Sequence, residues 1–252
     1  MMASGKRSPC HRKGIVMEKR IGIITATDCE SAALQALLTE KEAVPGPAGL
    51  TFWRGHLEGR PVVDVQAGIG KVNAALCTQA FIDSMHPDCI INAGVAGGLD
   101  PRLHIGDMVL SVSAAQHDFD TAYFGDPAGM LPGLNRIYIP ASEELVEAME
   151  EISRENGIPC LRGIVASGDQ FIADPEKKDW IRDTFTAACT EMEGAAIAQV
   201  CWLNQVPFAI LRAISDGAGD EAGMQYEEFE RMAAEQAMTI LKSLPARLAE
   251  SI

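Results

Sequence analysis

Basic side chains are scarce in this chain, and long apolar runs are missing. Lys and Arg total 21 of its 252 residues against 35 Asp and Glu, for a formal net charge of −14. A surface of that charge repels phosphate backbones, which argues against a nucleic-acid partner. The apolar runs fall far short of the roughly 18 residues that a membrane-spanning helix needs, so we expect no membrane partner either.

Paired cysteines are lacking as well. The seven cysteines show no CxxC spacing, which argues against a disulfide framework or a zinc ribbon. We therefore expect reduced cysteines and a cytoplasmic protein. Among the five scattered histidines, only the pair His117–Asp118 suggests a metal ligand set, and a hydrogen bond within a loop explains it better. We predict no metal site and no cofactor.

Familiar nucleophile and phosphate-binding motifs do not occur. No GxSxG elbow and no Cys–His arrangement is visible, which disfavours covalent acyl chemistry. Gly68-Ile69-Gly70-Lys71 resembles a phosphate loop but lacks its spacing. These glycines either permit tight packing of a strand on a helix or present backbone amides to a ligand. The small residues of Ala93–Gly98 leave the same choice and indicate that some group approaches the backbone closely.

The composition is otherwise that of a folded protein. Apolar residues make up 47% and charged residues 22% of the chain, which excludes intrinsic disorder of the whole. Residues 1–20 differ, because they hold six basic side chains and one acid without the apolar segment of a secretory signal. We expect residues 1–19 to be a disordered extension and residues 20–252 to form a single domain.

Strand-like and helix-like segments alternate along that domain. Short apolar runs predict strands at residues 20–27, 51–57, 62–66, 89–92, 107–113, 161–166 and 208–214. Helical spacing predicts a helix with Asp28 as N-cap and an apolar stripe at 32–38. It also predicts helices at 71–85, 142–156, 175–184, 192–204 and 227–249. Residues 114–136 lack periodicity, as functional loops often do. The alternation indicates an α/β fold with a parallel or mixed sheet covered on both faces.

Polar residues gather where the predicted strands end. Ligands bind at the carboxyl ends of the strands in open sheets of this type. The candidate segments are Thr27–Glu30, Gly68–Lys71, Gly94–Gly98, Ser167–Phe171 and Ser215–Asp216.

Carboxylates dominate these candidate segments. The helix dipole explains one acid in Glu191-Met192-Glu193 but not the pair. Arg212, inside an apolar strand, needs either a buried acid as a partner or a task in a site. Together with Glu30 and Asp216, and without a metal pattern, these carboxylates favour acid–base chemistry on a glycosidic bond or a similar group.

Six motifs in order resemble the methylthioadenosine/S-adenosylhomocysteine nucleosidases, which belong to the nucleoside phosphorylase superfamily. They are IGIIxAxxxE at 21–30, AGIGKVNAA at 67–75, INAGVAGG at 91–98, SGDQFI at 167–172, EMEGAAIA at 191–198 and RAISDGAGD at 212–220. The resemblance implies a three-layer α/β/α sandwich around a central mixed sheet. It also implies hydrolysis of the N-glycosidic bond of 5′-methylthioadenosine and/or S-adenosylhomocysteine, which releases adenine and a thioribose product.

The same resemblance implies roles for individual residues. Glu30 matches the base that activates water, and Asp216 matches the acid that protonates the purine at N7. Glu193 matches the ligand of the ribose hydroxyls, with Met192 beneath the sugar. The other matching positions bind substrate or water: Phe171 stacks on adenine, Ile172 reads the base through its backbone, Arg212 helps to hold the water, and Ile69, Glu191 and Ser215 complete the set.

Two aromatic positions extend the implied site. Phe124 and Tyr226 match residues that line the pocket for the 5′-substituent, and Phe124 reaches it across a dimer interface. The resemblance, together with the aromatic residues of loop 114–136, therefore implies a homodimer that binds a small adenine nucleoside.

Two departures from the family pattern leave the preferred nucleoside open. Val95 stands where the family often has Ser, and Thr27 where it often has Met. The alternatives are a purine nucleoside phosphorylase or a nucleosidase for another nucleoside, such as aminofutalosine. The acids in residues 25–31 would repel phosphate, which favours hydrolysis. A nucleoside sensor without catalysis would have lost the acid and the base, and both are present.

Overall fold

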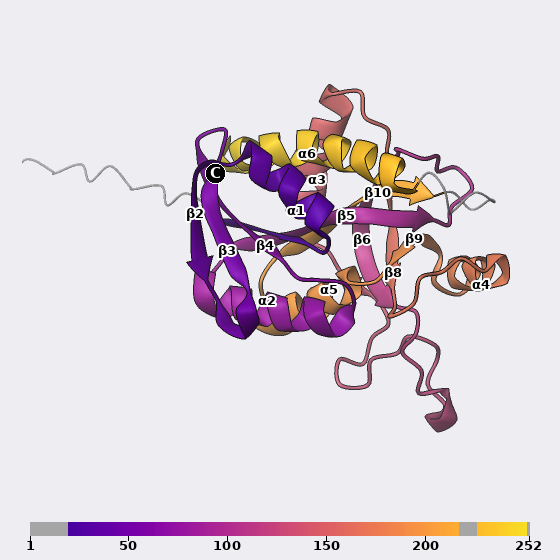
Figure 1. The fold of residues 1–252 in the computed structure, drawn as a ribbon. Coiled ribbons are helices and arrows are strands. Elements are labelled where there is room, and N and C mark those ends of the chain that lie inside the picture. Colours follow the sequence, from indigo (N-terminus) through magenta and orange to yellow (C-terminus); the bar gives the residue numbers. More distant parts are fainter. Residues whose placement is uncertain (1–19, 217–225, 251–252) are drawn as a thin grey trace, which may run out of the picture.

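The computed structural model describes residues 20–216 and 226–250, except for the side chains of Asp216, residues 226–234 and Glu250 (Figure 1). The extension predicted at residues 1–19 lies outside this part of the chain. Within the described part, no helix combines the length and the apolar character needed to cross a membrane.

Strands and helices alternate as the sequence predicts. The strands are β1 (Ile21–Thr25), β2 (Thr39–Pro45), β3 (Thr51–Leu57), β4 (Arg60–Gln66), β5 (Cys89–Gly98), β6 (Met108–Gln116), β7 (Ile139–Pro140), β8 (Cys160–Ser167), β9 (Ala187–Glu191) and β10 (Phe208–Asp216). The helices are α1 (Asp28–Leu37), α2 (Lys71–Met85), α3 (Glu143–Glu155), α4 (Pro175–Phe185), α5 (Gly194–Asn204) and α6 (Tyr226–Glu250).

The strands form one mixed sheet in the order β10-β6-β8-β9-β5-β1-β4-β3-β2, with β7 on β6. One additional pairing, between β10 and β5, changes its shape. Because β10 pairs with β6, and β8 and β9 lead back to β5, these five strands close into a ring. β1 to β4 continue from β5 as an open sheet. The closure brings the carboxyl ends of β5, β9 and β10 close together.

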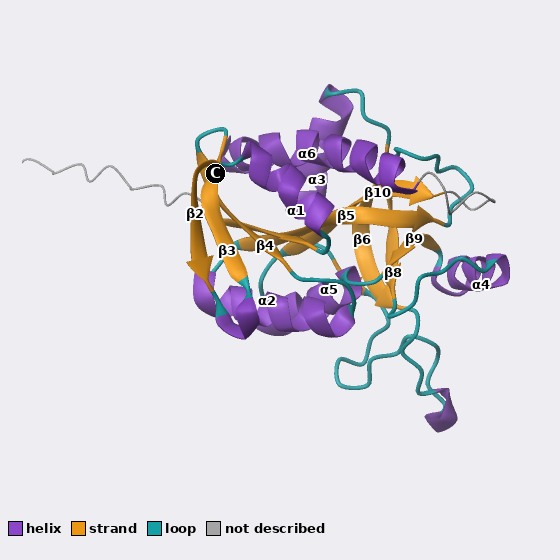
Figure 2. Ribbon diagram, viewed as in Figure 1, coloured by secondary structure: helices purple, strands orange, loops and turns teal. Residues whose placement is uncertain are grey.

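Helices cover both faces of the sheet, which confirms the predicted layers (Figure 2). Helices α1, α3 and α6 pack on one face against alternate strand residues such as Ile23 and Ile91. Helices α2 and α5 pack on the other face against the intervening residues, such as Ile24 and Ile90. Successive strand residues point to opposite faces, so each apolar strand contributes to both cores.

Helix α1 begins one residue earlier than predicted, and Asp28 is not its N-cap. Thr27 has an extended backbone, and its hydroxyl accepts a hydrogen bond of 3.3 Å from the Glu30 N–H. The Glu30 carboxylate in turn accepts one of 3.1 Å from the Thr27 N–H. This reciprocal pair is a capping box. Asp28 is the first helical residue, and its carboxylate accepts a hydrogen bond from Gln66.

Three strands escaped the sequence prediction. Strand β7 has only two residues, which is too short to give a pattern. Strand β2 is almost wholly exposed, so it lacks the apolar alternation that marks a half-buried strand. Strand β9 is wholly buried but only five residues long. The predicted loop 114–136 is shorter than expected, because β6 continues to Gln116 and a 3₁₀ turn spans Ala122–Phe124.

Candidate active site

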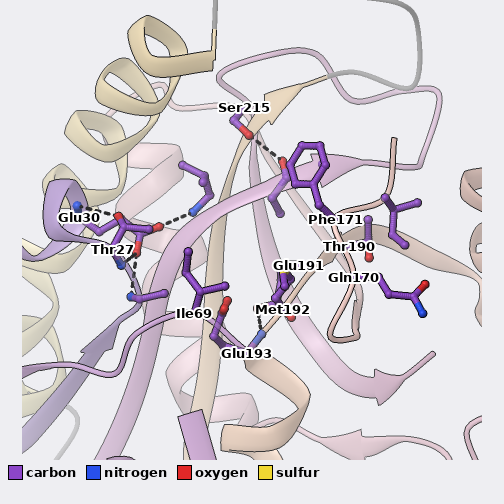
Figure 3. A pocket seen from close by; sticks show the side chains of 15 residues that line it. Thr27, Glu30, Ile69, Gln170, Phe171, Thr190, Glu191, Met192, Glu193 and Ser215 are labelled. Atoms are coloured by element: carbon purple, nitrogen blue, oxygen red, sulfur yellow. Dashed lines mark hydrogen bonds between the residues drawn. The ribbon is translucent and has the colours of Figure 1, made fainter. Parts of the chain in front are cut away.

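A pocket lies at the carboxyl ends of β1, β5, β9 and β10, as expected for an α/β sheet (Figure 3). Eight of the site residues predicted from the sequence line it: Glu30, Ile69, Phe171, Ile172, Glu191, Met192, Glu193 and Ser215. They come from segments up to 185 positions apart, from Glu30 to Ser215. The fold therefore brings together most of the set that sequence motifs had selected.

Two described residues of the predicted site, Arg212 and Phe124, do not line this pocket. Arg212 is buried beneath it. Phe124 is 80% exposed on the 3₁₀ turn and is absent from the pocket of its own chain. The side chains of Asp216 and Tyr226 lie outside the described residues, although their backbones end β10 and begin α6.

The Glu30 carboxylate is fixed by three backbone donors. Its Oε2 accepts hydrogen bonds from the N–H groups of Ala26 at 2.8 Å and Thr27 at 3.1 Å. Its Oε1 accepts one of 3.0 Å from the Val95 N–H on β5. The side chain is 3% exposed, and it lines the pocket. The capping box that starts α1 therefore also aims a carboxylate at the site, and Val95 contributes through its backbone.

Gly94 allows Glu30 and Arg212 to approach the strand between them. A Cβ at Gly94 would lie 2.6 Å from Glu30 Oε1 and would overlap Nη1 of Arg212. Gly94 and Arg212 are also register partners on β5 and β10. The close approach that the small residues of 93–98 predicted is thus made by two charged side chains.

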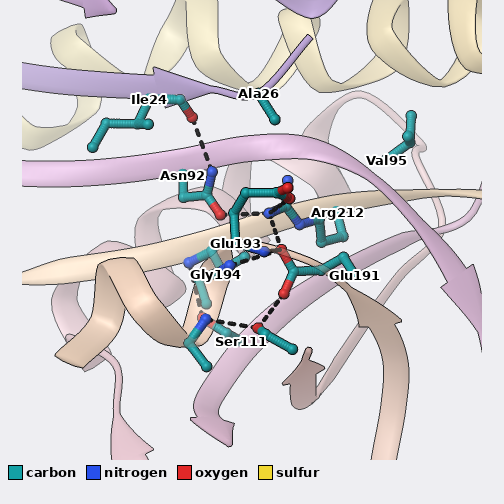
Figure 4. Close-up of polar contacts among 12 residues, drawn as sticks. Ile24, Ala26, Asn92, Val95, Ser111, Glu191, Glu193, Gly194 and Arg212 are labelled. Carbon is teal, nitrogen blue, oxygen red and sulfur yellow. Dashed lines mark hydrogen bonds and ion pairs between the residues drawn. The ribbon is translucent and has the colours of Figure 1, made fainter. Parts of the chain in front are cut away.

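The Glu191 carboxylate is occupied by the protein itself (Figure 4). Its Oε2 accepts hydrogen bonds from the N–H groups of Glu193 at 3.0 Å and Gly194 at 2.7 Å, where α5 begins. Oε2 also pairs with Arg212, and Oε1 accepts from the Ser167 hydroxyl. Glu191 lines the pocket, but its Oε2 accepts hydrogen bonds at the N-terminus of α5. An acid at this position is stabilised by the helix dipole, as the sequence predicted for one of the two acids.

Arg212 is a buried counter-charge for the carboxylates around it. It is 1% exposed, it pairs with Glu191, and it donates a hydrogen bond of 2.5 Å to Asn92 Oδ1. A Glu193 oxygen lies 4.0 Å from its guanidinium. Burial disfavours the charge, but Glu191, Glu193 and Glu30 outweigh it and raise the pKa of Arg212. The sequence left two roles open for Arg212, a salt bridge to a buried acid or a task in a site. This geometry favours the salt bridge.

Glu193 lines the pocket. Its Oε1 accepts a hydrogen bond of 2.8 Å from the Gly70 N–H, so this glycine amide meets a carboxylate rather than a ligand. Burial and the neighbouring Glu191 raise the pKa of Glu193 to about 7, against the effects of Arg212 and Gly70. Glu193 therefore exchanges its proton near neutral pH, and its remaining acceptor capacity is available to hydroxyl groups.

The other end of the pocket is more apolar (Figure 3). Phe171 presents a ring that is 62% exposed, and Ile172 is buried beside it. Gln170 and Thr190 also line this end. A flat, exposed aromatic ring at the edge of a pocket suits stacking against a planar base.

Sequence patterns missed some of the lining residues. Thr190 gave no signal because strand β9 had not been predicted. Gln170 lies in the candidate segment Ser167–Phe171, but the sequence did not single it out. Gly97, in the small-residue segment, has a distinctive position: it pairs with Thr190 of β9 on one side and with Asp216 of β10 on the other. The backbone of Asp216 is thereby placed beside a lining residue of the pocket.

The described residues contain no group of three or more His, Cys, Asp and Glu side chains arranged to hold a metal ion. His117 and Asp118, the pair considered from the sequence, have different surroundings. The buried His117 ring has no hydrogen-bond partner within the described part of the chain. Asp118 pairs with Lys71 at 2.6 Å.

Comparison with known proteins agrees with this geometry. The model of a family described as the phosphorylase superfamily matches residues 20–245. The 5′-methylthioadenosine/S-adenosylhomocysteine nucleosidase of Geobacillus thermodenitrificans (strain NG80-2) is 40% identical over 227 residues, which cover 89% of this chain and 95% of the relative. The chain belongs to the phosphorylase superfamily. Within it, the chain belongs to the family of these nucleosidases.

Solved structures of the superfamily share the fold. The nucleosidase of Colwellia psychrerythraea, in complex with adenine, has a TM-score of 0.86 and 37% identity, over 92% of this chain and 96% of that one. The futalosine hydrolase of Helicobacter pylori has a TM-score of 0.85 and 34% identity, over 90% and 97% of the two chains.

For a member of this nucleosidase family, the pocket divides into two chemically different parts. Glu30 and Glu193 place carboxylates at one part, where hydroxyl groups and water can be bound. Phe171 and Ile172 make the other part flat and apolar. The arrangement suits a ligand with a polyhydroxylated portion joined to a planar one.

Proposed function

We propose that this protein hydrolyses the N-glycosidic bond of 5′-methylthioadenosine and/or S-adenosylhomocysteine, releasing adenine and a thioribose product. The observation that carries the proposal is the Glu30 carboxylate, held by three backbone N–H groups at the edge of a pocket that also contains Glu193 and Phe171. A base fixed in this way is ready to accept a proton from water without reorganising.

Glu30 acts as the general base in this proposal. It accepts a proton from the attacking water while the bond between C1′ and the base nitrogen lengthens. Its negative charge also stabilises the cationic sugar that forms as the base departs. Arg212, below Glu30 and Gly94, balances the carboxylates so that they can be held together.

Asp216 acts as the general acid. Adenine is a poor leaving group as an anion, and a proton on N7 lets it leave neutral. An Asp at its ordinary pKa of about 3.9 is protonated in roughly one molecule in a thousand at pH 7, so the purine acceptor must bias the proton. Support comes from the backbone register, since Asp216 pairs with Gly97 of the pocket.

Glu193, Met192 and Phe171 bind the two halves of the nucleoside. The Glu193 carboxylate, which takes one hydrogen bond from Gly70, accepts further hydrogen bonds from the two ribose hydroxyls. Met192 packs beneath the sugar, Phe171 stacks on adenine, and the backbone of Ile172 reads the base. Ile69, which is 58% exposed and lines the pocket, contributes apolar surface.

Hydrolysis fits the pocket better than phosphorolysis. No Lys, Arg or His is found among the described lining residues. Arg212, the cation beneath, already pairs with Glu191 and Asn92. A phosphate anion beside Glu30 and Glu193 would therefore meet like charges without a compensating donor. Water carries no such penalty.

The 5′-substituent distinguishes two candidate substrate groups. Thionucleosides of adenine are favoured by the 40% identity to a nucleosidase of that name. A nucleoside of the futalosine type is the second candidate, because a futalosine hydrolase has a TM-score of 0.85 to this chain. Val95 and Thr27 line the pocket, and they are the positions where this chain departs from the family pattern.

A product assay tests the proposal directly. The protein is incubated with 5′-methylthioadenosine, S-adenosylhomocysteine or aminofutalosine, each with and without phosphate, and the sugar is identified. We expect free adenine and free 5-methylthioribose from methylthioadenosine, at a rate that phosphate does not change. A sugar 1-phosphate formed only with phosphate would assign a phosphorylase instead. Binding without turnover would assign a sensor.

We further propose that the protein acts as a homodimer in the cytoplasm. Phe124 and its neighbour Tyr123 are 80% and 94% exposed, on a turn that projects from the chain (Figure 1). Such a pair of exposed rings suits a position over the pocket of a second copy. Within the described part of the chain, the thiols of Cys77, Cys160, Cys189 and Cys201 are not in disulfides, as in proteins of reducing compartments. Sedimentation of the protein tests the dimer.

A further inference from the structure

A charged network outside the pocket joins two segments that reach the pocket to a third, after β6, that does not. Lys71 is the first residue of α2, Asp118 follows β6, and Asp169 follows β8. The Lys71 ammonium lies 2.6 Å from Asp118 Oδ1 and 3.1 Å from Gln116 Oε1. Asp118 Oδ2 accepts a hydrogen bond of 2.8 Å from the Asp169 N–H. None of these four side chains lines the pocket.

Two consecutive amides of the Gly68–Lys71 segment connect this network to the pocket. The Gly70 N–H donates to Glu193 Oε1 at 2.8 Å. The next amide, that of Lys71, donates to Asp169 Oδ1 at 2.7 Å. Glu193 faces the hydroxyl-binding part of the pocket, and Asp169 begins the segment that carries Phe171. The consecutive amides of Gly70 and Lys71 therefore contact both the residue of the hydroxyl-binding part and the segment of the apolar part.

The contacts around this point are too tight to shift independently. Gly70 has φ of +97°, and a Cβ there would lie 3.1 Å from Asp169 Oδ1. A Cβ at Gly168 would overlap the buried His117 ring and would lie 3.0 Å from the Asp118 carboxyl carbon. The loop that carries Phe171 thus rests directly against residues 117 and 118.

The charges in the network are shielded from water. The Lys71 and Asp118 side chains are 17% and 15% exposed. Burial tends to raise the pKa of Asp118, but the ammonium of Lys71 and the Asp169 N–H more than offset it, so the pKa lies below its ordinary value. Removing the ammonium would leave a largely buried carboxylate without its partner, which forces the loops to move.

We propose that Lys71 is a positioning residue, which acts through Asp118 and Asp169 to hold the purine-binding segment 168–172 at a fixed distance from Glu193. The inference rests on the proposed function, because it assigns the two parts of the pocket to the base and the ribose. Its consequence is specific. A ligand that occupies both parts depends on the network, whereas a ligand that occupies only the base part does not.

The test compares a whole nucleoside with its free base. For Lys71→Met we expect kcat/KM for 5′-methylthioadenosine to fall on the order of 100-fold, as misplacement of reacting groups does. The Kd of adenine should change by no more than about threefold, because stacking on Phe171 and contacts with Ile172 persist. Lys71→Arg should recover most of the activity, because it restores a cation toward Asp118.

A second pair of variants addresses the same network without removing a buried charge. Asp169→Asn keeps the Oδ1 acceptor for the Lys71 N–H and should behave like wild type. Asp169→Ala removes it and should reproduce the nucleoside-selective loss. This pair keeps the proposal testable if Lys71→Met fails to fold.

Arg162→Met is the matched control. Arg162 also joins separate elements, with Glu143 at 2.5 Å and Glu150 at 2.9 Å between β8 and α3. Its loss should lower the melting temperature and leave the nucleoside-to-adenine ratio unchanged. Equal losses for nucleoside and adenine in Lys71→Met, or an equal change of the ratio in Arg162→Met, would overturn the proposal. Wild-type protein that binds neither ligand would overturn the proposed function with it.

Discussion

Glu30 and Arg212 approach the Cα of Gly94 so closely that no side chain fits there. Glu30 comes from the first turn of α1, and Arg212 from the strand that pairs with Gly94. A carboxylate that borders the pocket and the buried cation that balances it thus both lie against the position that a Cβ of this glycine would take. A methyl group added at Gly94 would therefore disturb both charged side chains.

Gly94→Ala should damage both stability and activity. The methyl group would overlap the Arg212 guanidinium and crowd Glu30, and overpacking of this kind costs about 1–3 kcal/mol. We expect a lower free energy of unfolding and a loss of kcat/KM on the order of 100-fold, since Glu30 must move. Gly133→Ala, where a Cβ meets nothing within 4 Å, is the control. Wild-type kinetics in Gly94→Ala would show that the position of Glu30 is not critical.

Glu30→Gln should separate binding from turnover. The amide oxygen can keep the hydrogen bonds from the Ala26 and Thr27 N–H groups, and the one from Val95 is lost. The side chain keeps its size, but the base is lost. We expect nearly unchanged affinity for an unreactive nucleoside analogue and a fall in kcat of several orders of magnitude. Asp28→Asn, on the same helix turn but bonded to Gln66, is the control. Retained turnover would remove Glu30 from the mechanism.

The activity should follow the ionisation of Glu193. Its pKa of about 7 arises from burial and from Glu191. Below that pH the free enzyme carries a neutral acid there, which accepts fewer hydrogen bonds from ribose. We expect kcat/KM to rise with pH up to about 7 and then to level off, because this ratio reports the free enzyme. Glu193→Gln should lose activity and also lose this limb of the profile. An identical limb in the variant would assign it to another group.

Asp64 should make the protein less stable as the pH rises. This side chain of β4 is fully buried, and burial raises its pKa from 3.8 to about 7 despite hydrogen bonds from Gln35 and Ser31. Between these values the folded state binds more protons than the unfolded state, so the free energy of unfolding falls as pH increases. A shift of this size corresponds to about 4 kcal/mol.

Denaturant titrations at pH 5 and pH 8 measure this effect. Asp64→Asn has no proton to lose, so the difference between the two pH values should shrink in the variant by about 2–3 kcal/mol, the part of the full effect that falls between pH 5 and the pKa of about 7. Ser31→Ala, which removes one donor to Asp64, should keep a pH-dependent term of the same sign. An unchanged pH dependence in Asp64→Asn would mean that other groups account for it.

The sequence predicted the layers because these depend on local patterns, and eight of the residues predicted for the site line the pocket. Apolar runs and their spacing place strands and helices, and the carboxyl ends of strands indicate where ligands bind. The closure of β5 on β10 left no local trace, since it depends on pairing between segments more than 100 residues apart. The exposed β2 and the short β9 likewise lack the alternation that identifies a strand.

The different roles of Glu191 and Glu193 show where sequence reasoning reaches its limit. Both precede α5, and both match a family motif. Glu191 is occupied because Ser167, Arg212 and the helix amides converge on it. Glu193, two residues later, receives one donor from Gly70 and faces the pocket. Only the packing of distant segments decides which acid serves the fold and which can serve a substrate.

Asp216→Asn should affect substrates according to their leaving groups. Asp216 ends β10 in register with Gly97 of the pocket, and its proposed task is to donate a proton to purine N7. A carboxamide has the same size but cannot supply that proton. We therefore expect most activity toward adenine nucleosides to be lost. The loss should be much smaller with a nitrophenyl riboside, because its leaving group, nitrophenolate, departs without protonation. Equal losses for both substrates would make the residue structural. In that case the melting temperature should fall as well, so measuring stability and both rates on one variant separates an acid catalyst from a residue that only supports the end of β10.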